Sequence, residues 1–317
     1  MIVKIGIIGC GAVTELLYLK TIPNISDCKI AYLYDKDVQR AQYLASIINA
    51  EVTDIDTLRA NSDVIIICTP PSSHHQLVKD SMIEGKIIVC EKPFVPYYED
   101  AIELIQLAKE KKCKLYVAHF RRLFPSLVLA KKIASTIEWG PLKKINIVEG
   151  GRFIWQAKSD YFLKNKEGGV IADTGSHTID SALYIAGLDT MIKGKDDVTI
   201  EQVIKDKSEP SHRVDAKFKI KDIEVNLKLS RHEVLANQIA LIFENGEIIV
   251  PAFLASYVLI KTNKGRLIVN SSEKYTRLEE VFYHQYKNIL AGKNDDIFNA
   301  DRFAGLTLII DKLNNIA

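Results

Sequence analysis

Residues 3–14 read VKIGIIGCGAVT, an apolar β-branched run that ends in two closely spaced glycines. Four similar apolar runs follow, at 29–35, 64–68, 86–91 and 114–119. Amphipathic stretches separate these runs, at 12–22, 36–48, 72–84 and 97–112. Near-continuous apolar runs are typical of strands that are covered on both faces, and their alternation with helices predicts an α/β domain with a doubly wound parallel sheet.

The pattern changes after about residue 142 to longer runs of alternating apolar and polar residues, linked by KD, NG and KG turns. Such runs predict an antiparallel sheet with one wet face. Two helices are expected before or within it, at 123–136 and 175–186, the second ending at Gly187. We therefore expect a nucleotide-type domain over residues 1–120 and an α+β domain over 121–317.

Composition argues for a protein that acts on small molecules. Of 317 residues, 47% are apolar and 26% are charged, and the net charge is +2 without a long basic run. These values indicate neither a nucleic-acid partner nor a membrane surface. The N-terminus reads as a first strand and not as a signal peptide, so a cytoplasmic location is expected.

The five cysteines are odd in number, and none forms a CxxC pair. They predict neither a disulfide framework nor a zinc site, and we expect no metal. Burial as small apolar side chains is favoured over a reactive thiol.

Gly9 and Gly11 follow the first predicted strand and begin the first predicted helix, and Thr14 replaces the third glycine of a dinucleotide-binding fingerprint. Asp35, at the end of the second strand, stands where an acidic residue accepts hydrogen bonds from the adenosine ribose. This favours NAD, although Lys36 and Arg40 leave NADP open. The alternatives are a simple tight turn and an Asp35 that caps the next helix.

The segment CTPPSSHH at 68–75 follows another buried strand, and ligands bind at the carboxyl ends of such strands. His74 is expected there at the site, although an exposed first helical turn is an equally good interpretation. The predicted cofactor contacts are Gly9, Gly11, Ala12, Val13, Asp35, Thr69, Pro70, His74, Glu91 and Lys92.

Two further segments carry candidate catalytic groups, CEKPF at 90–94 and GGVIADTGSHTID at 168–180. Pro93 makes a fixed turn, or a cis bond, plausible after Lys92. Asp173 and His177 are four residues apart, which places them on one helix face in a general acid/base layout. The glycines beside them suggest a backbone that passes close to a ligand. Individually, Lys92 could be a surface lysine and His177 a core histidine.

Five segments follow one another along the chain in the order GIIGCGAVTE, TPPSSH, EGKIIVCEKP, FRRLFP and GGVIADTGSHTID. With them the chain resembles the glucose-fructose oxidoreductase, inositol dehydrogenase and rhizopine catabolism (Gfo/Idh/MocA) family over nearly its whole length. The resemblance implies a Rossmann domain followed by an open-faced, mostly antiparallel sheet. It also implies nicotinamide-dependent oxidation or reduction of a sugar, cyclitol or sugar nucleotide, in a homodimer or homotetramer built through that sheet.

The resemblance assigns roles to individual residues. Lys92 matches the lysine that contacts the substrate hydroxyl and the nicotinamide ribose, and His177 matches the acid/base histidine. Asp173 matches the aspartate that orients the substrate and the histidine. Glu91 is similar to the glutamate that structures the turn and lies near the nicotinamide end. The chain departs from the family pattern at Thr14 and at His119, where many relatives have asparagine.

Substrate contacts are expected from Lys92, Asp173 and His177 and from three residues of GRFIWQAKSDYF at 151–162, namely Arg152, Trp155 and Tyr161. Arginine and aromatic side chains suit hydrogen bonding and stacking on a sugar, although packing explains Trp155 and Tyr161 equally well. Because the two halves of the candidate site come from different domains, we expect a cleft between them.

Two other functions stay open. One is a hydrolase of the same family that uses NAD transiently and leaves no net redox change. The other is a regulator that binds a dinucleotide without turnover, although such a protein would be expected to lose the lysine or the histidine. Finally, alternating strands predict an exposed apolar patch on the second sheet for a partner subunit.

Overall fold

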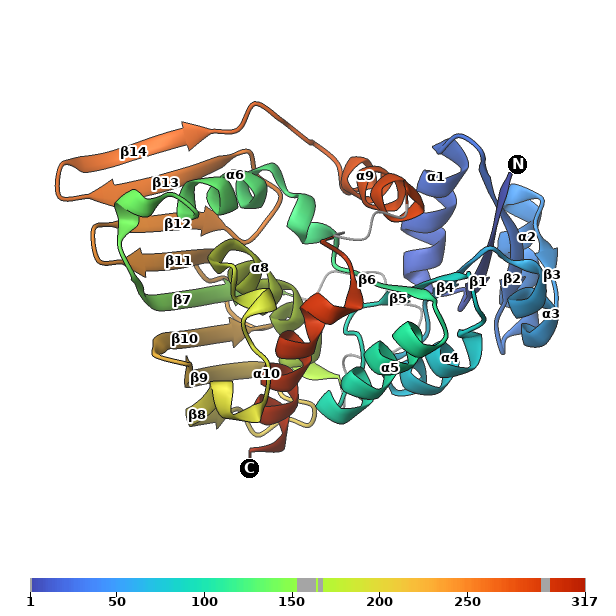
Figure 1. Ribbon diagram of the computed structural model, residues 1–317, viewed down its shortest axis with the longest axis horizontal. Helices are drawn as coiled ribbons and strands as arrows, with labels where there is room; N and C mark the ends of the chain where they lie inside the picture. Colours follow the sequence, from blue (N-terminus) through green and yellow to red (C-terminus); the bar gives the residue numbers. More distant parts are fainter. Residues whose placement is uncertain (1, 153–163, 165–167, 292–296, 317) are drawn as a thin grey trace. The chain divides into compact units, whose positions relative to one another are not determined.

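The computed structural model describes residues 2–152, 164, 168–291 and 297–316. Among these, residues 2–119, 277–291 and 297–301 form one compact unit, and residues 120–152, 164, 168–276 and 302–316 form the other. Each unit has its own sheet, as Figure 1 shows. The predicted α/β and α+β architecture is confirmed.

The N-terminal unit is built on a six-stranded sheet in the order β3-β2-β1-β4-β5-β6, and all of its strand pairs are parallel. Its strands are β1 (Val3–Ile8), β2 (Cys28–Tyr34), β3 (Glu51–Val52), β4 (Val64–Ile67), β5 (Ile87–Glu91) and β6 (Lys114–Ala118). All four residues of β4 are buried, as expected for a strand with helices on both faces. The five predicted strands are therefore present.

Helices connect successive strands of this sheet. They are a π-helical turn η1 (Thr14–Tyr18) with α1 (Leu19–Thr21), α2 (Val38–Ile48), α3 (Ile55–Asn61), α4 (His74–Ser81) and α5 (Tyr98–Glu110). The strand β3 and the helix α3 were not expected from the sequence. β3 has only two residues, too few for a visible period, whereas α3 carries a start signal in Asp54, whose carboxylate accepts from the amides of Asp56 and Thr57.

A late segment of the chain completes the N-terminal unit. Helix α9 (Leu278–Ala291) packs on α1 and η1. Beyond it, Phe298 accepts a hydrogen bond from the amide of Val117 (2.8 Å), and Asn299 forms a bridge with Tyr116. These contacts occupy the edge strand β6, which would otherwise present unpaired backbone groups.

The second unit contains an eight-stranded sheet in the order β14-β13-β12-β11-β7-β10-β9-β8. Its strands are β7 (Leu142–Gly150), β8 (Val198–Lys205), β9 (Arg213–Ile220), β10 (Ile223–Ser230), β11 (Gln238–Phe243), β12 (Glu247–Pro251), β13 (Tyr257–Thr262) and β14 (Gly265–Asn270). The β7 and β10 pair is parallel and the other pairs are antiparallel. The sheet is thus mostly antiparallel, as predicted.

Helices α6 (Pro125–Ala134), α8 (Ser176–Ala186) and α10 (Ala304–Asn315) pack on one face of this sheet. A turn η4 (Phe120–Leu123) precedes α6, and a π-helical turn η6 (Ile171–Gly175) leads directly into α8. Gly187 ends α8 in the left-handed conformation, as expected from the sequence.

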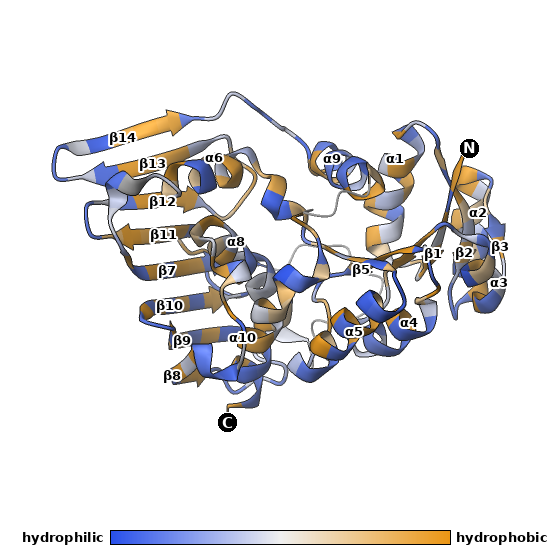
Figure 2. Ribbon diagram, in the orientation of Figure 1, coloured by the Kyte–Doolittle hydropathy of each residue, from blue (hydrophilic) through white to orange (hydrophobic). Residues whose placement is uncertain are grey.

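The other face of the second sheet carries both polar and apolar side chains. The hydropathy colouring shows both apolar and polar residues along the strands of this sheet (Figure 2). A shallow groove on this face is lined largely by polar side chains, among them Lys144, Asn146, Lys217, Asn226 and Gln238. Apolar residues such as Val148 and Ile204 lie between them, so the lining of the groove is mixed. None of the described helices is long and apolar enough to cross a lipid bilayer.

Candidate functional site

The glycine loop after β1 has the geometry that its sequence predicts. Gly9 has φ of +106°, and a Cβ atom there would lie 2.6 Å from the backbone oxygen of Cys68. At Gly11, by contrast, a Cβ atom would meet nothing within 4 Å, so a ligand has open space over the backbone. Thr14 is buried and its hydroxyl donates to the Gly9 carbonyl (2.7 Å), which closes the loop without a third glycine. The loop fits a dinucleotide pyrophosphate.

Asp35 lies beside this loop, directly after β2. One carboxylate oxygen accepts from the amide of Cys10 (2.6 Å), and the other accepts from the amide of Asp37 (2.9 Å). The N-cap of α2 is Asp37, whose side chain accepts from the amide of Arg40 (3.0 Å). The interpretation of Asp35 as the helix cap is therefore wrong. Its carboxylate is fixed at the loop, with lone pairs left over for a ribose.

The remaining residues of the predicted cofactor set on this side lie at the carboxyl ends of β1 and β4. Ala12 is buried and Val13 half-buried at the start of the first helix, while Thr69 is half-buried and Pro70 exposed after β4. The hydroxyl of Ser73 donates to that of Thr69 (2.7 Å). A dinucleotide contact by these residues stays a prediction.

His74 is fully buried, so the interpretation as an exposed first turn is wrong. Its Nε2 lies 2.8 Å from the Thr69 carbonyl, and its Nδ1 lies 3.0 Å and 2.9 Å from the carbonyls of Pro93 and Phe94. Burial lowers the pKa of His74, and the hydrogen bonds to the three carbonyls oppose this shift. His74 thus joins the loop after β4 to the turn after β5, and a direct contact with a cofactor stays a prediction.

The turn that carries Lys92 is held from within the N-terminal unit. The Lys92–Pro93 bond is cis, as the sequence made plausible. Glu91 is buried, and one of its oxygens accepts from the amide of Lys92 (3.0 Å). Its other oxygen accepts from the hydroxyl of Tyr18 in η1. This hydroxyl accepts in turn from that of Tyr286 in α9 (2.7 Å).

These hydrogen bonds place a carboxyl group in an apolar setting. Burial raises the pKa of Glu91, while the Tyr18 hydroxyl and the neighbouring Lys92 lower it. Burial also raises the pKa of Tyr18 well above its ordinary value, so that Tyr18 stays a neutral donor. Sequence reasoning missed Tyr18 and Tyr286, since no local pattern links two residues that are 268 positions apart.

In the second unit, Asp173 lies in the π-helical turn η6 and forms an ion pair with Arg231, just beyond β10 (2.9 Å). The Arg231 side chain is 3% exposed, and it also donates to the carbonyl of Gly169 (3.1 Å). The ion pair fixes the position of the Asp173 side chain. Arg231 could not be predicted from the sequence, because the residues around it do not distinguish it from other arginines at the ends of strands.

His177 lies in the first turn of α8, immediately after η6. It is 7% exposed, and the ring of Phe120 meets it edge-on at a centroid distance of 5.2 Å. Its backbone carbonyl accepts from the hydroxyl of Ser181 (2.8 Å). An imidazole in this setting is nearly sheltered from water, which suits a neutral acid/base group.

Two arginines of the FRRLFP segment hold α8 close to His177. Arg121 binds both carboxylate oxygens of Glu149 in β7 (2.8 Å and 3.0 Å), and Glu149 also accepts from the hydroxyl of Thr178. Arg122 is fully buried and donates to Asp180 at 2.5 to 3.1 Å. Helix α8 is therefore anchored one residue and three residues after His177.

The glycines around Asp173 have a different cause from the one expected. Gly169 has φ of +79°, and a Cβ atom there would lie 3.0 Å from the carbonyl oxygen of Ser211. At Gly175 a Cβ atom would lie 3.0 Å from a methyl carbon of Leu229 in β10. Close packing against the protein's own segments thus accounts for both glycines, and they are not evidence of a nearby ligand.

Four further residues were singled out in the sequence, namely Arg152, Trp155, Tyr161 and His119. Arg152 is exposed at the end of β7, and its role in substrate binding stays a prediction. Trp155 and Tyr161 lie outside the described residues. His119 is fully buried after β6.

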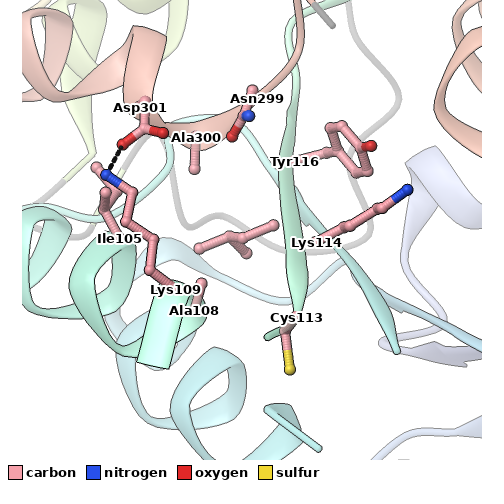
Figure 3. A pocket seen from close by; sticks show the side chains of 10 residues that line it. Ile105, Ala108, Lys109, Cys113, Lys114, Tyr116, Asn299, Ala300 and Asp301 are labelled. Atoms are coloured by element: carbon pink, nitrogen blue, oxygen red, sulfur yellow. Dashed lines mark ion pairs between the residues drawn. The ribbon is translucent and has the colours of Figure 1, made fainter. Parts of the chain in front are cut away.

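Among the described residues of the N-terminal unit, two other groupings of polar side chains do not make a second candidate site. A pocket of about 290 Å³ lies at the amino end of β6. The glycine loop, by contrast, follows the carboxyl end of β1. Figure 3 shows the ion pair between Lys109 and Asp301 (2.9 Å) at its wall. The carboxylates of Asp100 and Glu103 lie near His75, but Lys79 pairs with Glu103 at 2.5 Å and thereby supplies the positive charge.

Comparison with known proteins agrees with the glycine loop and the parallel sheet. Residues 3–119 match the model of an oxidoreductase family with an NAD-binding Rossmann fold, Gfo/Idh/MocA. Residues 3–119 are therefore similar to the NAD-binding domain of this oxidoreductase family. The resemblance recognised in the sequence is thus confirmed, and the Rossmann unit is of the kind that binds a nicotinamide dinucleotide.

Relatives and solved structures extend this finding. An uncharacterised oxidoreductase of Schizosaccharomyces pombe is 31% identical over 202 residues, which are 61% of this chain and 54% of the relative. An inositol 2-dehydrogenase of Rhizobium meliloti is 26% identical over 59% of this chain and 56% of its own. The matches thus span about half the length of these relatives. An oxidoreductase of Thermotoga maritima, 16% identical, has the same fold over 99% of this chain and 96% of its own (TM-score 0.81).

Proposed function

We propose that this protein is an NAD(P)-dependent oxidoreductase that transfers a hydride between the nicotinamide and a secondary alcohol or ketone of a sugar, cyclitol or sugar nucleotide. The observation that carries the proposal is the arrangement at the carboxyl ends of the parallel strands. There the Gly9 and Gly11 loop, the fixed carboxylate of Asp35 and the braced turn of Lys92 follow three strands of one sheet. The relationship to an inositol 2-dehydrogenase supports a polyhydroxylated substrate.

The proposed chemistry assigns one task to each side chain. A bound nicotinamide supplies the hydride acceptor or donor. His177, sheltered against Phe120, takes the proton of the substrate hydroxyl during oxidation and returns it during reduction. Lys92 offers an ammonium group to the developing alkoxide, a contribution worth about 3 kcal/mol for a comparable donor.

Asp173 orients the substrate and His177, and its ion pair with Arg231 fixes its position. We propose Arg152, Trp155 and Tyr161 as further substrate contacts. Arginine forms hydrogen bonds to several hydroxyl groups at once, and aromatic rings pack on the apolar face of a sugar.

The test is turnover of a panel of polyols, aldoses and nucleotide sugars with NAD or NADP, followed by absorbance of the reduced nicotinamide. Lys92→Ala and His177→Asn are each expected to lower kcat by about 10²-fold or more on a confirmed substrate. Lys20→Ala, an exposed lysine of α1, is the matched control and should leave kcat unchanged.

Other outcomes would overturn the proposal. Release of an aglycone without net formation of reduced nicotinamide would indicate a redox-neutral hydrolase. Dinucleotide binding without turnover of any substrate in the panel would indicate a regulator. Turnover within a few-fold of the parent for both active-site variants would show that the residue roles are wrong.

A further inference from the structure

Residue Cys10 of the glycine loop is held at both ends of its peptide backbone. Its amide donates to Asp35 (2.6 Å), and its carbonyl accepts from Nε of Arg40 (2.9 Å). Asp35 and Arg40 thus bind the same residue, Cys10. The guanidinium of Arg40 therefore lies near the carboxylate that is placed to bind the adenosine ribose. Arg40 is the one cation among the residues of α2.

The positive charge of Arg40 is already compensated. Its terminal nitrogen forms an ion pair with Glu15 in η1, and the two side chains are only 18% and 23% exposed. The ring of Tyr43 lies beneath the guanidinium, 5.4 Å from its central carbon. Contacts on three sides, to Cys10, Glu15 and Tyr43, leave Arg40 little freedom to turn toward another anion.

The charges around this position disfavour a phosphate. A phosphate monoester carries a charge of about −1.5 to −2 at neutral pH, and Asp35 and Glu15 would both repel it. Two hydrogen bonds from backbone amides fix Asp35 in place, so it cannot move away from the added charge. Lys36 is nearby in sequence, but it is exposed, and an exposed lysine offers only a solvent-screened charge.

We propose that the Glu15–Arg40 ion pair, acting with Asp35, makes this protein select NAD(H) over NADP(H). In this proposal Glu15 is the specificity-determining residue, because it withholds from a 2'-phosphate the arginine that would otherwise bind it. A free ribose 2'-hydroxyl needs only an acceptor, and Asp35 supplies one. The inference rests on the proposed function only in that the protein binds a nicotinamide dinucleotide.

The experiment measures dissociation constants of NAD⁺ and NADP⁺ for the full chain by isothermal titration calorimetry, without a substrate. The parent should bind NAD⁺ at least about tenfold more tightly. Glu15→Gln keeps the shape of the side chain and removes its charge, so Arg40 becomes available as a bidentate phosphate ligand. We expect its affinity for NADP⁺ to rise about tenfold while its affinity for NAD⁺ changes less than threefold.

Two further variants identify the source of that gain. Glu103→Gln makes the same change of charge in an ion pair elsewhere in this unit, with Lys79 of α4, and should leave both affinities unchanged. Arg40→Leu in the Glu15→Gln background should abolish the gain for NADP⁺. The gain should also shrink as salt concentration rises, because it arises from a charge pair that is partly exposed.

The outcomes separate this inference from the proposed function. A parent that binds NADP⁺ as tightly as NAD⁺, or a folded Glu15→Gln variant with an unchanged ratio of affinities, would overturn the selectivity of Glu15 while leaving an oxidoreductase intact. Binding of neither dinucleotide at millimolar concentration would overturn both. Selective NAD⁺ binding without turnover would leave the inference standing and count against the oxidoreductase.

Discussion

At the scale of single residues, Glu91 is a buried carboxyl group whose pKa the fold changes. Its carboxyl group is buried between the Tyr18 hydroxyl and the amide of Lys92. Burial raises its pKa above the ordinary value of 4.5, so the folded chain binds this proton more tightly than the unfolded chain does. Stability that the proton confers is therefore complete at low pH and is lost as pH rises above 4.5 toward the folded pKa.

Tyr18→Phe removes the hydroxyl that opposes this shift, so the folded pKa of Glu91 should rise further. We expect the variant to lose about 1 kcal/mol of unfolding free energy near pH 5 and about 2 to 3 kcal/mol near pH 8, measured by urea unfolding. Tyr43→Phe, at an exposed tyrosine of α2, is the control and should cost about 0.5 kcal/mol or less at either pH. An equal loss at both pH values would show that Tyr18 does not stabilise the Glu91 carboxylate.

The backbone conformation at Gly169 requires a glycine. Gly169→Ala introduces a Cβ atom at φ of +79° and 3.0 Å from the Ser211 carbonyl oxygen. We expect a loss of about 1 to 3 kcal/mol of unfolding free energy from strain and crowding. Gly194→Ala meets nothing within 4 Å in an extended backbone and should cost far less. Comparable losses for the two variants would contradict this account.

At the scale of elements, helix α8 carries the candidate base and depends on side chains that precede it by many residues. Thr178 donates to Glu149, which Arg121 binds through two hydrogen bonds. Thr178→Val keeps the shape of the side chain and removes the donor, so the first turn of α8 loses one anchor. Because a small displacement of a catalytic group costs rate more than binding, kcat should fall about tenfold or more with KM within about threefold.

The control for this prediction lies on the same helix. The hydroxyl of Ser181 donates to the His177 carbonyl, a bond that lies within α8 itself. Ser181→Ala should therefore leave kcat within about twofold of the parent. If both variants lowered kcat equally, a general weakening of the helix would explain the effect, and Thr178 would have no positioning role.

The same elements show what the sequence could and could not predict. Strands such as β4 are apolar throughout, so periodicity and the glycine turn located the parallel sheet and the Gly9 loop. Amphipathic periodicity predicts that α9 buries one face, but it does not say which unit that face packs on. The partners Tyr286 and Arg231 were missed for the same reason, since long-range contacts leave no local pattern. Asp173 and His177 could be proposed as a pair because both lie in one short segment.

At the scale of the whole molecule, the open face of the second sheet is the surface where a partner subunit is expected. The face is wide and continuous over eight strands, and Asn146 and Asn226 bond to each other across it (2.9 Å). Scattered apolar residues such as Val148 lie among lysine and amide side chains. Protein interfaces combine an apolar centre with a polar rim, so side chains of both kinds are expected on a surface that binds a partner.

We therefore expect a homodimer or homotetramer at about 10 µM. Light scattering should then give a mass that is a multiple of the monomer mass of 35.7 kDa. Val148→Arg places a charge at the centre of this face, and in a two-fold interface the same charge is added by both subunits. The variant should shift toward the monomer, whereas Lys20→Glu, at an exposed position of the Rossmann unit, should keep the parent mass. A parent protein that is monomeric at this concentration would refute the prediction. An oligomer that Val148→Arg leaves intact would place the interface on another surface.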